Sequence, residues 1–133
     1  MTAEATVPIK HDADILSARK AARQMAARLG FSSTDLALIA TAISEIARNI
    51  LVYASRGEMT FEEVSEPHRR GIVVVARDEG PGIADVEQAM QDGYSTGRGL
   101  GLGLPGARRL MDDFSIESNV GQGTTIVMKK WAR

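Results

Sequence analysis

Apolar positions in the first quarter of the chain repeat with the period of a helix. The repeat begins at Asp12 or Asp14 and keeps to one helical face as far as Leu29. Gly30 then provides the residue type that most often follows the end of a helix. The pattern predicts one amphipathic helix over this segment.

A second and longer apolar repeat follows after a short break. Ser33 or Ser32 can cap its first turn, and Asp35 adds a negative charge near the positive end of the helix dipole. The repeat continues to about Ala54, where the sequence Ser-Arg-Gly (55–57) ends it. We expect this helix to bury its apolar stripe.

Strand-like stretches occur mainly in the second half of the chain. Two of them, 59–64 and 71–78, are joined by a polar stretch (65–70) that predicts a hairpin loop. The first alternates between apolar and polar residues, whereas the second is a continuous apolar run that is typical of a central strand. Further strands are predicted at 115–118 and 124–131, together with an edge strand at 5–10 that contains Pro8.

The region between the predicted central strand and the last two strands is rich in glycine. It predicts a short helix from Ile83 to Met90, a glycine-rich loop over 92–106, and a helix that starts near Pro105 and continues to Phe114. Helices thus come early and strands mostly late, with connections of hairpin length. This order predicts an α+β fold, a two-layer sandwich in which helices cover one face of a mostly antiparallel sheet.

Composition limits the kind of protein that this chain can form. A chain of 133 residues with 44 % apolar and 25 % charged residues is predicted to form a single domain over 1–133. Its 16 basic and 17 acidic side chains leave a net charge of −1, which gives no general attraction to nucleic acid or to anionic membranes. There is no cysteine and no apolar run long enough to cross a bilayer. We therefore expect a cytoplasmic protein that binds neither nucleic acid nor membranes.

Glu45 and Asn49 interrupt the second helix four residues apart. At 3.6 residues per turn, both side chains project in nearly the same direction, beside the apolar stripe. Glu45 can be a solvated charge that pairs with Arg48. Alternatively, its carboxylate and the Asn49 amide oxygen can bind Mg²⁺ or activate a hydroxyl group. The helix alone does not decide between these interpretations.

Two glycine-rich segments have the composition of ligand-binding loops. RDEGPGI (77–83) places Asp78 at the end of the predicted central strand, and Gly80 and Gly82 allow the backbone to turn closely around a ligand. GRGLGLGLPG (97–106) leads into a helix start, where free N–H groups can bind phosphate. Each segment by itself is also compatible with an ordinary turn or a flexible loop.

The glycine spacing of the second segment also matches the dinucleotide-binding fingerprint. That fingerprint should directly follow a buried strand, but residues 91–99 are polar, and Glu117 lies too near to serve as the usual ribose-binding acid. A P-loop is excluded because GxxxxGK[ST] does not occur in the sequence. Dinucleotide binding of the Rossmann type is therefore disfavoured.

Four short motifs nevertheless occur in a recognisable order. They are Glu45-x-x-x-Asn49, Asp78-x-Gly80-x-Gly82, Gly99-x-Gly101-x-Gly103 and Gly121-x-Gly123-Thr124. Their order and intervals over residues 32–130 resemble the Bergerat (GHKL) ATP-binding fold shared by gyrase B, Hsp90, histidine kinases and MutL. The short chain resembles the anti-sigma-factor kinases of this family. TAISEIARNILVYA, DEGPGI and GLPGARRLMDDF are most similar to the RsbT-type switch kinases of the bacterial stressosome.

The resemblance implies roles for individual residues. Glu45 would be the general base that takes the proton from a substrate Ser or Thr hydroxyl, and Asn49 would bind Mg²⁺. Asp78 would accept a hydrogen bond from the adenine amino group. Gly82 would keep the wall of the adenine site thin, and Thr124 would support the base.

The same resemblance assigns the second glycine-rich segment to the phosphates of ATP. Gly99, Gly101 and Gly103 would face the phosphate groups, and residues from about Met90 to Arg98 would form a mobile lid. Arg98 would neutralise charge on the terminal phosphate. The implied nucleotide site also includes Gly80, Ile83, Leu100 and Leu102.

The function that the resemblance implies is that of a protein serine/threonine kinase that uses ATP and Mg²⁺. Its expected substrates are STAS-domain scaffold proteins of the stressosome, and after switching partner it would activate a PP2C-type phosphatase of the stress cascade. Two alternatives share the motifs. One is an ATP-binding partner-switching or anti-sigma module with little catalysis, which has no need of a base such as Glu45. The other is an ATP hydrolase like gyrase or MutL, which couples hydrolysis to dimerising domains.

Overall fold

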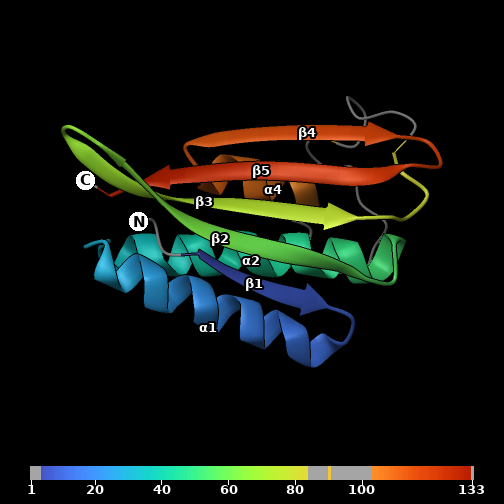
Figure 1. Ribbon diagram of the computed structural model, residues 1–133, viewed down its shortest axis with the longest axis horizontal. Helices are drawn as coiled ribbons and strands as arrows, with labels where there is room; N and C mark the ends of the chain where they lie inside the picture. Colours follow the sequence, from blue (N-terminus) through green and yellow to red (C-terminus); the bar gives the residue numbers. More distant parts are fainter. Residues whose placement is uncertain (1–3, 84–89, 91–102, 133) are drawn as a thin grey trace.

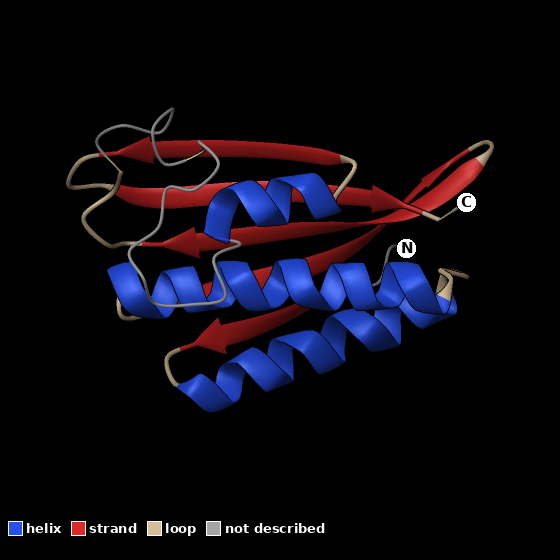
Figure 2. Ribbon diagram, turned by 180° about the vertical axis from the view of Figure 1, so that it is seen from behind, coloured by secondary structure: helices blue, strands red, loops and turns tan. Residues whose placement is uncertain are grey.

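The computed structural model describes residues 4–83, 90 and 103–132, which form a helical layer packed on a sheet. The antiparallel sheet has the strand order β1-β2-β3-β5-β4. Its strands are β1 (Glu4–Ile9), β2 (Gly57–Glu66), β3 (Arg69–Asp78), β4 (Asp113–Asn119) and β5 (Gly123–Trp131). The described helices are α1 (Asp12–Arg28), α2 (Ser33–Tyr53) and α4 (Gly103–Leu110), and they lie on one face of the sheet (Figures 1 and 2). The predicted two-layer α+β sandwich is confirmed.

Strand alternation determines which side chains face the helices. On β3, Ile72 and Val74 are fully buried, whereas Val73 between them is only half-buried. This strand lies at the centre of the sheet, as its continuous apolar run predicts. The largest fully buried side chains form the core between the two layers: Phe61, Ile9, Ile39, Ile43, Ile46, Met59, Ile72, Met128 and Val74.

Helix α2 lies at the centre of the helical layer and packs against both α1 and α4 (Figure 2). Contrary to the expectation from the sequence, it is long and apolar enough to cross a membrane by length and composition alone, but 44 % of its most apolar window is buried inside the domain. Ile39, Ile43 and Ile46 on this helix are fully buried. Its apolar character is therefore accounted for by its place in the core.

The ends of α1 and α2 follow the capping signals of the sequence. Ser32 caps α2, since its Oγ accepts a hydrogen bond of 3.1 Å from the Asp35 backbone N–H. Gly30, after α1, has a φ of +89°, a conformation that glycine adopts without strain. After α2, however, the residue in the left-handed region is Ser55, with a φ of +70°.

The positive φ of Ser55 gives a prediction about stability. Because a side chain is unfavourable in this conformation, we expect Ser55→Gly to raise the free energy of unfolding by about 1 kcal/mol. Urea unfolding followed by circular dichroism measures this difference. Ser65→Gly in strand β2 is the matched control and should instead lower stability, because glycine weakens a strand. A destabilised Ser55→Gly protein would contradict the expected strain.

The hairpin between β2 and β3 is longer than its sequence pattern predicts. The two strands pair as far as Glu66 and Arg69, so the predicted loop over 65–70 shrinks to Pro67 and His68. The residues at these strand ends are polar on both faces, so they show no alternation of apolar and polar positions. Arg69 donates a hydrogen bond of 2.8 Å from Nε to Glu66 across the turn. The predicted edge strand with Pro8 is confirmed as β1, at one border of the sheet.

Helix α4 differs from its prediction at both ends. It begins at Gly103, two residues before Pro105, and it ends at Leu110 instead of continuing to Phe114. Phe114 lies in β4 and pairs with Met128 of β5. The predicted helix from Ile83 to Met90 falls on residues 84–89, which lie outside the described residues.

Contacts from β5 explain the early end of α4. Lys130 extends its Nζ to the Leu110 carbonyl oxygen at 2.9 Å, and the Trp131 backbone N–H donates to Asp112 Oδ2 at 2.8 Å. Lys130 is buried, with 8 % of its surface exposed, so its ammonium group caps the helix C-terminus from within the fold. A partner from a distant strand thus replaces the continuation of the helix.

Candidate active site

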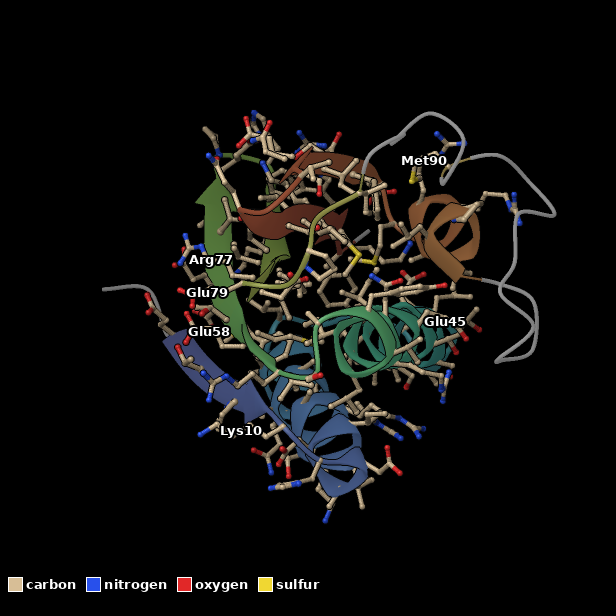
Figure 3. The ribbon with its side chains drawn as sticks, turned by 90° about the vertical axis from the view of Figure 1, so that its right-hand side faces the viewer. Lys10, Glu45, Glu58, Arg77, Glu79 and Met90 are labelled. Carbon is tan, nitrogen blue, oxygen red and sulfur yellow. The ribbon has the colours of Figure 1, made fainter. Side chains whose placement is uncertain are left out.

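The apolar helix α2 carries two polar side chains on its α4 side. Glu45 is buried, with 9 % of its surface exposed, and Asn49, one turn further along, is half-buried. Figure 3 shows Glu45 extending from α2 close to α4. The interpretation of Glu45 as a solvated surface charge is therefore wrong.

The Glu45 carboxylate joins α2 to the start of α4. Its Oε1 accepts a hydrogen bond of 3.3 Å from Arg48 Nη1, which is the pairing considered from the sequence. Its Oε2 accepts a hydrogen bond of 3.1 Å from the backbone N–H of Gly103. Gly103 is the first residue of α4 and the last glycine of Gly99-x-Gly101-x-Gly103. A negative charge at a helix start is favourable, because the N–H groups there have no partner within the helix.

Asn49 offers a polar group to a ligand. In the parts of the chain that the structure describes, 4–83, 90 and 103–132, no hydrogen bond occupies its side-chain amide. The position is half-buried on a helix that is otherwise packed into the core. Its amide atoms remain accessible, because no buried side-chain nitrogen or oxygen of the described residues lacks a hydrogen-bond partner, so the group is available to a ligand.

A row of polar residues crosses the end of the sheet. Asp78 is the last residue of β3, and it pairs with Thr124 of β5, which in turn pairs with Ser118 of β4. Each of these residues continues, by alternation, the face of its strand that is turned toward the helices. Asp78 Oδ1 accepts a hydrogen bond of 2.9 Å from the Gly80 backbone N–H. No described residue donates to its second oxygen, which leaves that oxygen as an acceptor at the end of the sheet.

Gly80 and Gly82 hold the turn after β3 against its neighbours. A Cβ atom on Gly80 would lie 2.5 Å from the Cβ of Ala54, at the end of α2. Gly82 has a φ of +77°, and a Cβ there would collide with the backbone carbonyl of Asn119. The sequence identifies both glycines as turn residues, and the structure adds that larger side chains do not fit.

Ser118 also belongs to this site, although none of the sequence motifs includes it. Its Oγ lies 2.7 Å from Thr124 Oγ1, accepts a hydrogen bond of 2.7 Å from the Ile83 backbone N–H, and donates to the Gly123 carbonyl oxygen at 3.2 Å. The available signal was strand alternation, because Phe114, Ile116 and Ser118 share one face of β4. A hydroxyl group at the end of an apolar face is a candidate for a buried hydrogen bond.

The remaining predicted residues belong to the segment before α4. Arg98, Gly99, Leu100, Gly101 and Leu102 lie outside the described residues, and so does the predicted lid apart from Met90, which is buried. The structure therefore brings together two groups: Glu45, Asn49 and Gly103 around α2 and α4, and Asp78, Gly80, Gly82, Ile83 and Thr124 at the end of the sheet.

Asn49 is the residue here that could contribute to a metal site completed by a bound ligand. Among the described residues, no group of three or more His, Asp or Glu side chains is arranged to hold a metal ion by itself. Mg²⁺ commonly uses only one or two protein oxygen atoms and completes its shell with substrate phosphates and water. The amide oxygen of Asn49 is a ligand of this kind, and no described residue forms a hydrogen bond with it.

Comparison with protein families identifies the domain. Residues 10–130 match the family model described as the histidine kinase-like ATPase domain. The chain is 47 % identical to the serine/threonine-protein kinase RsbT of Bacillus subtilis over 133 residues, and the match covers both chains completely. It is also 33 % identical over 120 residues to an anti-sigma F factor of Caldanaerobacter subterraneus, covering 86 % of this chain and 82 % of the relative.

Solved structures support the fold. A crystal structure of the RsbU and RsbW domains of a Mycobacterium tuberculosis protein matches with a TM-score of 0.62 at 21 % identity, covering all of this chain and 32 % of the other. The mycobacterial sensor histidine kinase MprB matches with a TM-score of 0.56 at 16 % identity, covering 98 % of this chain and 99 % of the other. At such low identity these similarities establish the fold alone.

Proposed function

This chain belongs to the family of RsbT-type serine/threonine-protein kinases within the histidine kinase-like ATPase domains, and from that premise we propose which of its residues carry out the reaction. The protein is thus an ATP-binding protein kinase that is also similar to anti-sigma factors. The observation that carries the proposal is the buried Glu45 carboxylate bound to the first residue of α4, where the glycine-rich segment enters the fold.

In the proposed reaction, the nucleobase binds at the end of the sheet. The free oxygen of Asp78 accepts a hydrogen bond from the adenine amino group, with Thr124 beside it on the neighbouring strand. Gly80, Gly82 and Ile83 form the adjoining wall, where larger side chains at the two glycines would intrude. The support for this assignment is an unpaired acceptor next to a closely packed turn.

The phosphates lie between α2 and the start of α4 in this proposal. The start of α4 provides a helix N-terminus, although the Gly103 N–H itself is held by Glu45. The preceding residues Gly99, Leu100, Gly101 and Leu102 belong to the same glycine-rich segment of the sequence and are proposed to bind the phosphates. Asn49 would hold Mg²⁺, which when bound neutralises phosphate charge. Arg98 is proposed to act on the terminal phosphate from the same segment.

Glu45 is the proposed general base. The hydroxyl oxygen of a substrate Ser or Thr forms a bond to the γ-phosphorus of ATP, the bond to the β–γ bridging oxygen breaks, and ADP leaves. The hydroxyl proton passes to the Glu45 carboxylate. In the structure both carboxylate oxygens accept hydrogen bonds, so one of these bonds must open, or be shared, when the substrate arrives.

We propose STAS-domain scaffold proteins of the stressosome as substrates and a PP2C-type phosphatase of the stress cascade as the second partner. The support is the similarity over 133 residues to the serine/threonine-protein kinase RsbT and the similarity to anti-sigma factors. A reaction with cytosolic ATP and cytosolic scaffolds implies a cytoplasmic protein. Stable binding of ATP without transfer would instead describe a partner-switching module.

Incubation of the purified protein with γ-labelled ATP, Mg²⁺ and a STAS-domain partner tests the proposed transfer. We expect label on a Ser or Thr of the partner and little free phosphate, because Glu45 activates a hydroxyl of the acceptor. A reaction without the partner is the control for hydrolysis. Rapid phosphate release with an unlabelled partner would identify an ATP hydrolase, and bound ATP with neither product would identify a binding module.

A further inference from the structure

Two hydroxyl groups lie side by side beside the proposed adenine site. Ser118 Oγ and Thr124 Oγ1 are 2.7 Å apart on paired positions of β4 and β5. Thr124 is buried, with 6 % of its surface exposed, and it also pairs across the ladder with Asp78. The direction of the hydrogen bond between the two hydroxyls decides which group Thr124 offers to a ligand.

Counting hydroxyl hydrogen atoms favours one direction. The Ile83 backbone N–H donates to Ser118 Oγ, so one lone pair of this oxygen is occupied. The Ser118 hydroxyl has a single hydrogen to donate. The Gly123 carbonyl oxygen, 3.2 Å away, can only accept a hydrogen bond. If Ser118 donates to Gly123, Thr124 donates to Ser118, and each of these hydrogens has an acceptor. In the reverse direction, the Thr124 hydrogen would have no acceptor among the described residues.

We propose that Ser118 is a positioning residue that fixes Thr124 as a hydrogen-bond acceptor toward the nucleobase, so that the site selects a 6-aminopurine over a 6-oxopurine. The inference rests on the proposed adenine site at Asp78 and Thr124. Ser118 acts only through Thr124 and through the wall segment at Ile83, which it holds by its backbone.

The chemistry of the two bases gives this arrangement its selectivity. Adenine carries an amino group at C6 and a bare N1, whereas hypoxanthine carries a carbonyl at C6 and an N1–H. Asp78 and a fixed Thr124 both present lone pairs, which match an amino group and repel a carbonyl oxygen.

Binding of ATP and of inosine triphosphate, measured by isothermal titration calorimetry on the full chain, tests the inference. We expect Ser118→Ala to lower the ratio of ATP affinity to inosine triphosphate affinity by about 3- to 10-fold, the effect of one hydrogen bond. Freed from Ser118, the Thr124 hydroxyl can rotate and donate to the 6-oxopurine. Ser118→Thr retains the hydroxyl and should retain the ratio. Ser115→Ala, an exposed position on the same strand, is the matched control.

The outcomes separate this inference from the kinase assignment. An unchanged ratio in folded Ser118→Ala, or an equal loss for both nucleotides, would overturn it, because a purely structural role predicts equal loss. If Ser118→Ala does not fold, Thr124→Val carries the test, and an unchanged ratio there overturns the inference equally. A wild-type protein that binds ATP selectively but transfers no phosphate would overturn the proposed reaction alone. A wild-type protein that binds no ATP would overturn both.

Discussion

Replacement of Glu45 by glutamine is expected to lower phosphoryl transfer to the protein acceptor by about 100- to 10,000-fold, the usual contribution of general base catalysis. Glutamine has the same shape, and its amide oxygen can still accept the hydrogen bond from the Gly103 backbone N–H. It cannot take up a proton. The affinity for ATP should therefore change by less than about threefold, since the contact with α4 survives.

Arg48→Gln is the matched control for Glu45→Gln. It removes the 3.3 Å ion pair with Glu45 but leaves the carboxylate in place, and Arg48 itself is partly exposed. We expect transfer by this variant to stay within about a factor of five of wild type, because partly exposed ion pairs contribute little. Single-turnover transfer with saturating ATP separates the chemical step from binding. Glu45→Gln that transfers phosphate at the wild-type rate would remove the base assignment.

Asp78→Asn is expected to weaken ATP binding by about 10- to 100-fold, the range for a hydrogen bond to a charged group. The asparagine carbonyl oxygen can keep the 2.9 Å bond from the Gly80 backbone N–H, so the turn after β3 should survive. The amide NH₂ then replaces the free carboxylate oxygen. A donor would face the adenine amino group, which is itself a donor.

Glu79→Gln, at the exposed neighbouring position, removes the same charge without touching the row of polar residues. Calorimetric titration with ATP and Mg²⁺ compares the two variants, and thermal unfolding shows that both are folded. Equal affinities for ATP in wild type and Asp78→Asn would exclude adenine recognition by this residue. Equal losses in both variants would indicate a general effect of charge instead.

Local signals predict the architecture well where they are strong. The α2 helix is foreseeable because Ser32 caps it and its apolar repeat runs unbroken to its end. The central place of β3 follows from its continuous β-branched run. The ends of the β2–β3 hairpin were missed because polar strands that extend beyond the helical layer carry no alternating pattern.

The end of α4 could not be read from local sequence. Leu110, Met111 and Phe114 have a spacing that suits a continued helix, but the helix stops at Leu110. Lys130 and Trp131, some twenty residues further on, provide the contacts that end it. Such nonlocal capping overrides propensity, and it becomes visible only when β5 is placed against α4.

The candidate site was predictable to a similar degree. Spacing on α2 identified Glu45 and Asn49 as neighbours, and the turn chemistry after β3 identified Asp78, Gly80 and Gly82. Local sequence patterns do not predict which residues face each other on neighbouring strands. Only the ladder shows that Ser118 stands next to Thr124, because a cross-strand neighbour is set by pairing and not by distance along the chain.

If Glu45 takes the proton as proposed, its hydrogen bond from the Gly103 N–H couples proton transfer to the position of α4. A protonated carboxyl group is a weaker acceptor than a carboxylate, so each turnover would loosen the tether that holds the first turn of α4. The link also works in reverse, since any partner that pulls α4 away from α2 removes the Gly103 donor from the carboxylate. Proton uptake by Glu45 and the seating of α4 on α2 would then depend on the same carboxylate group.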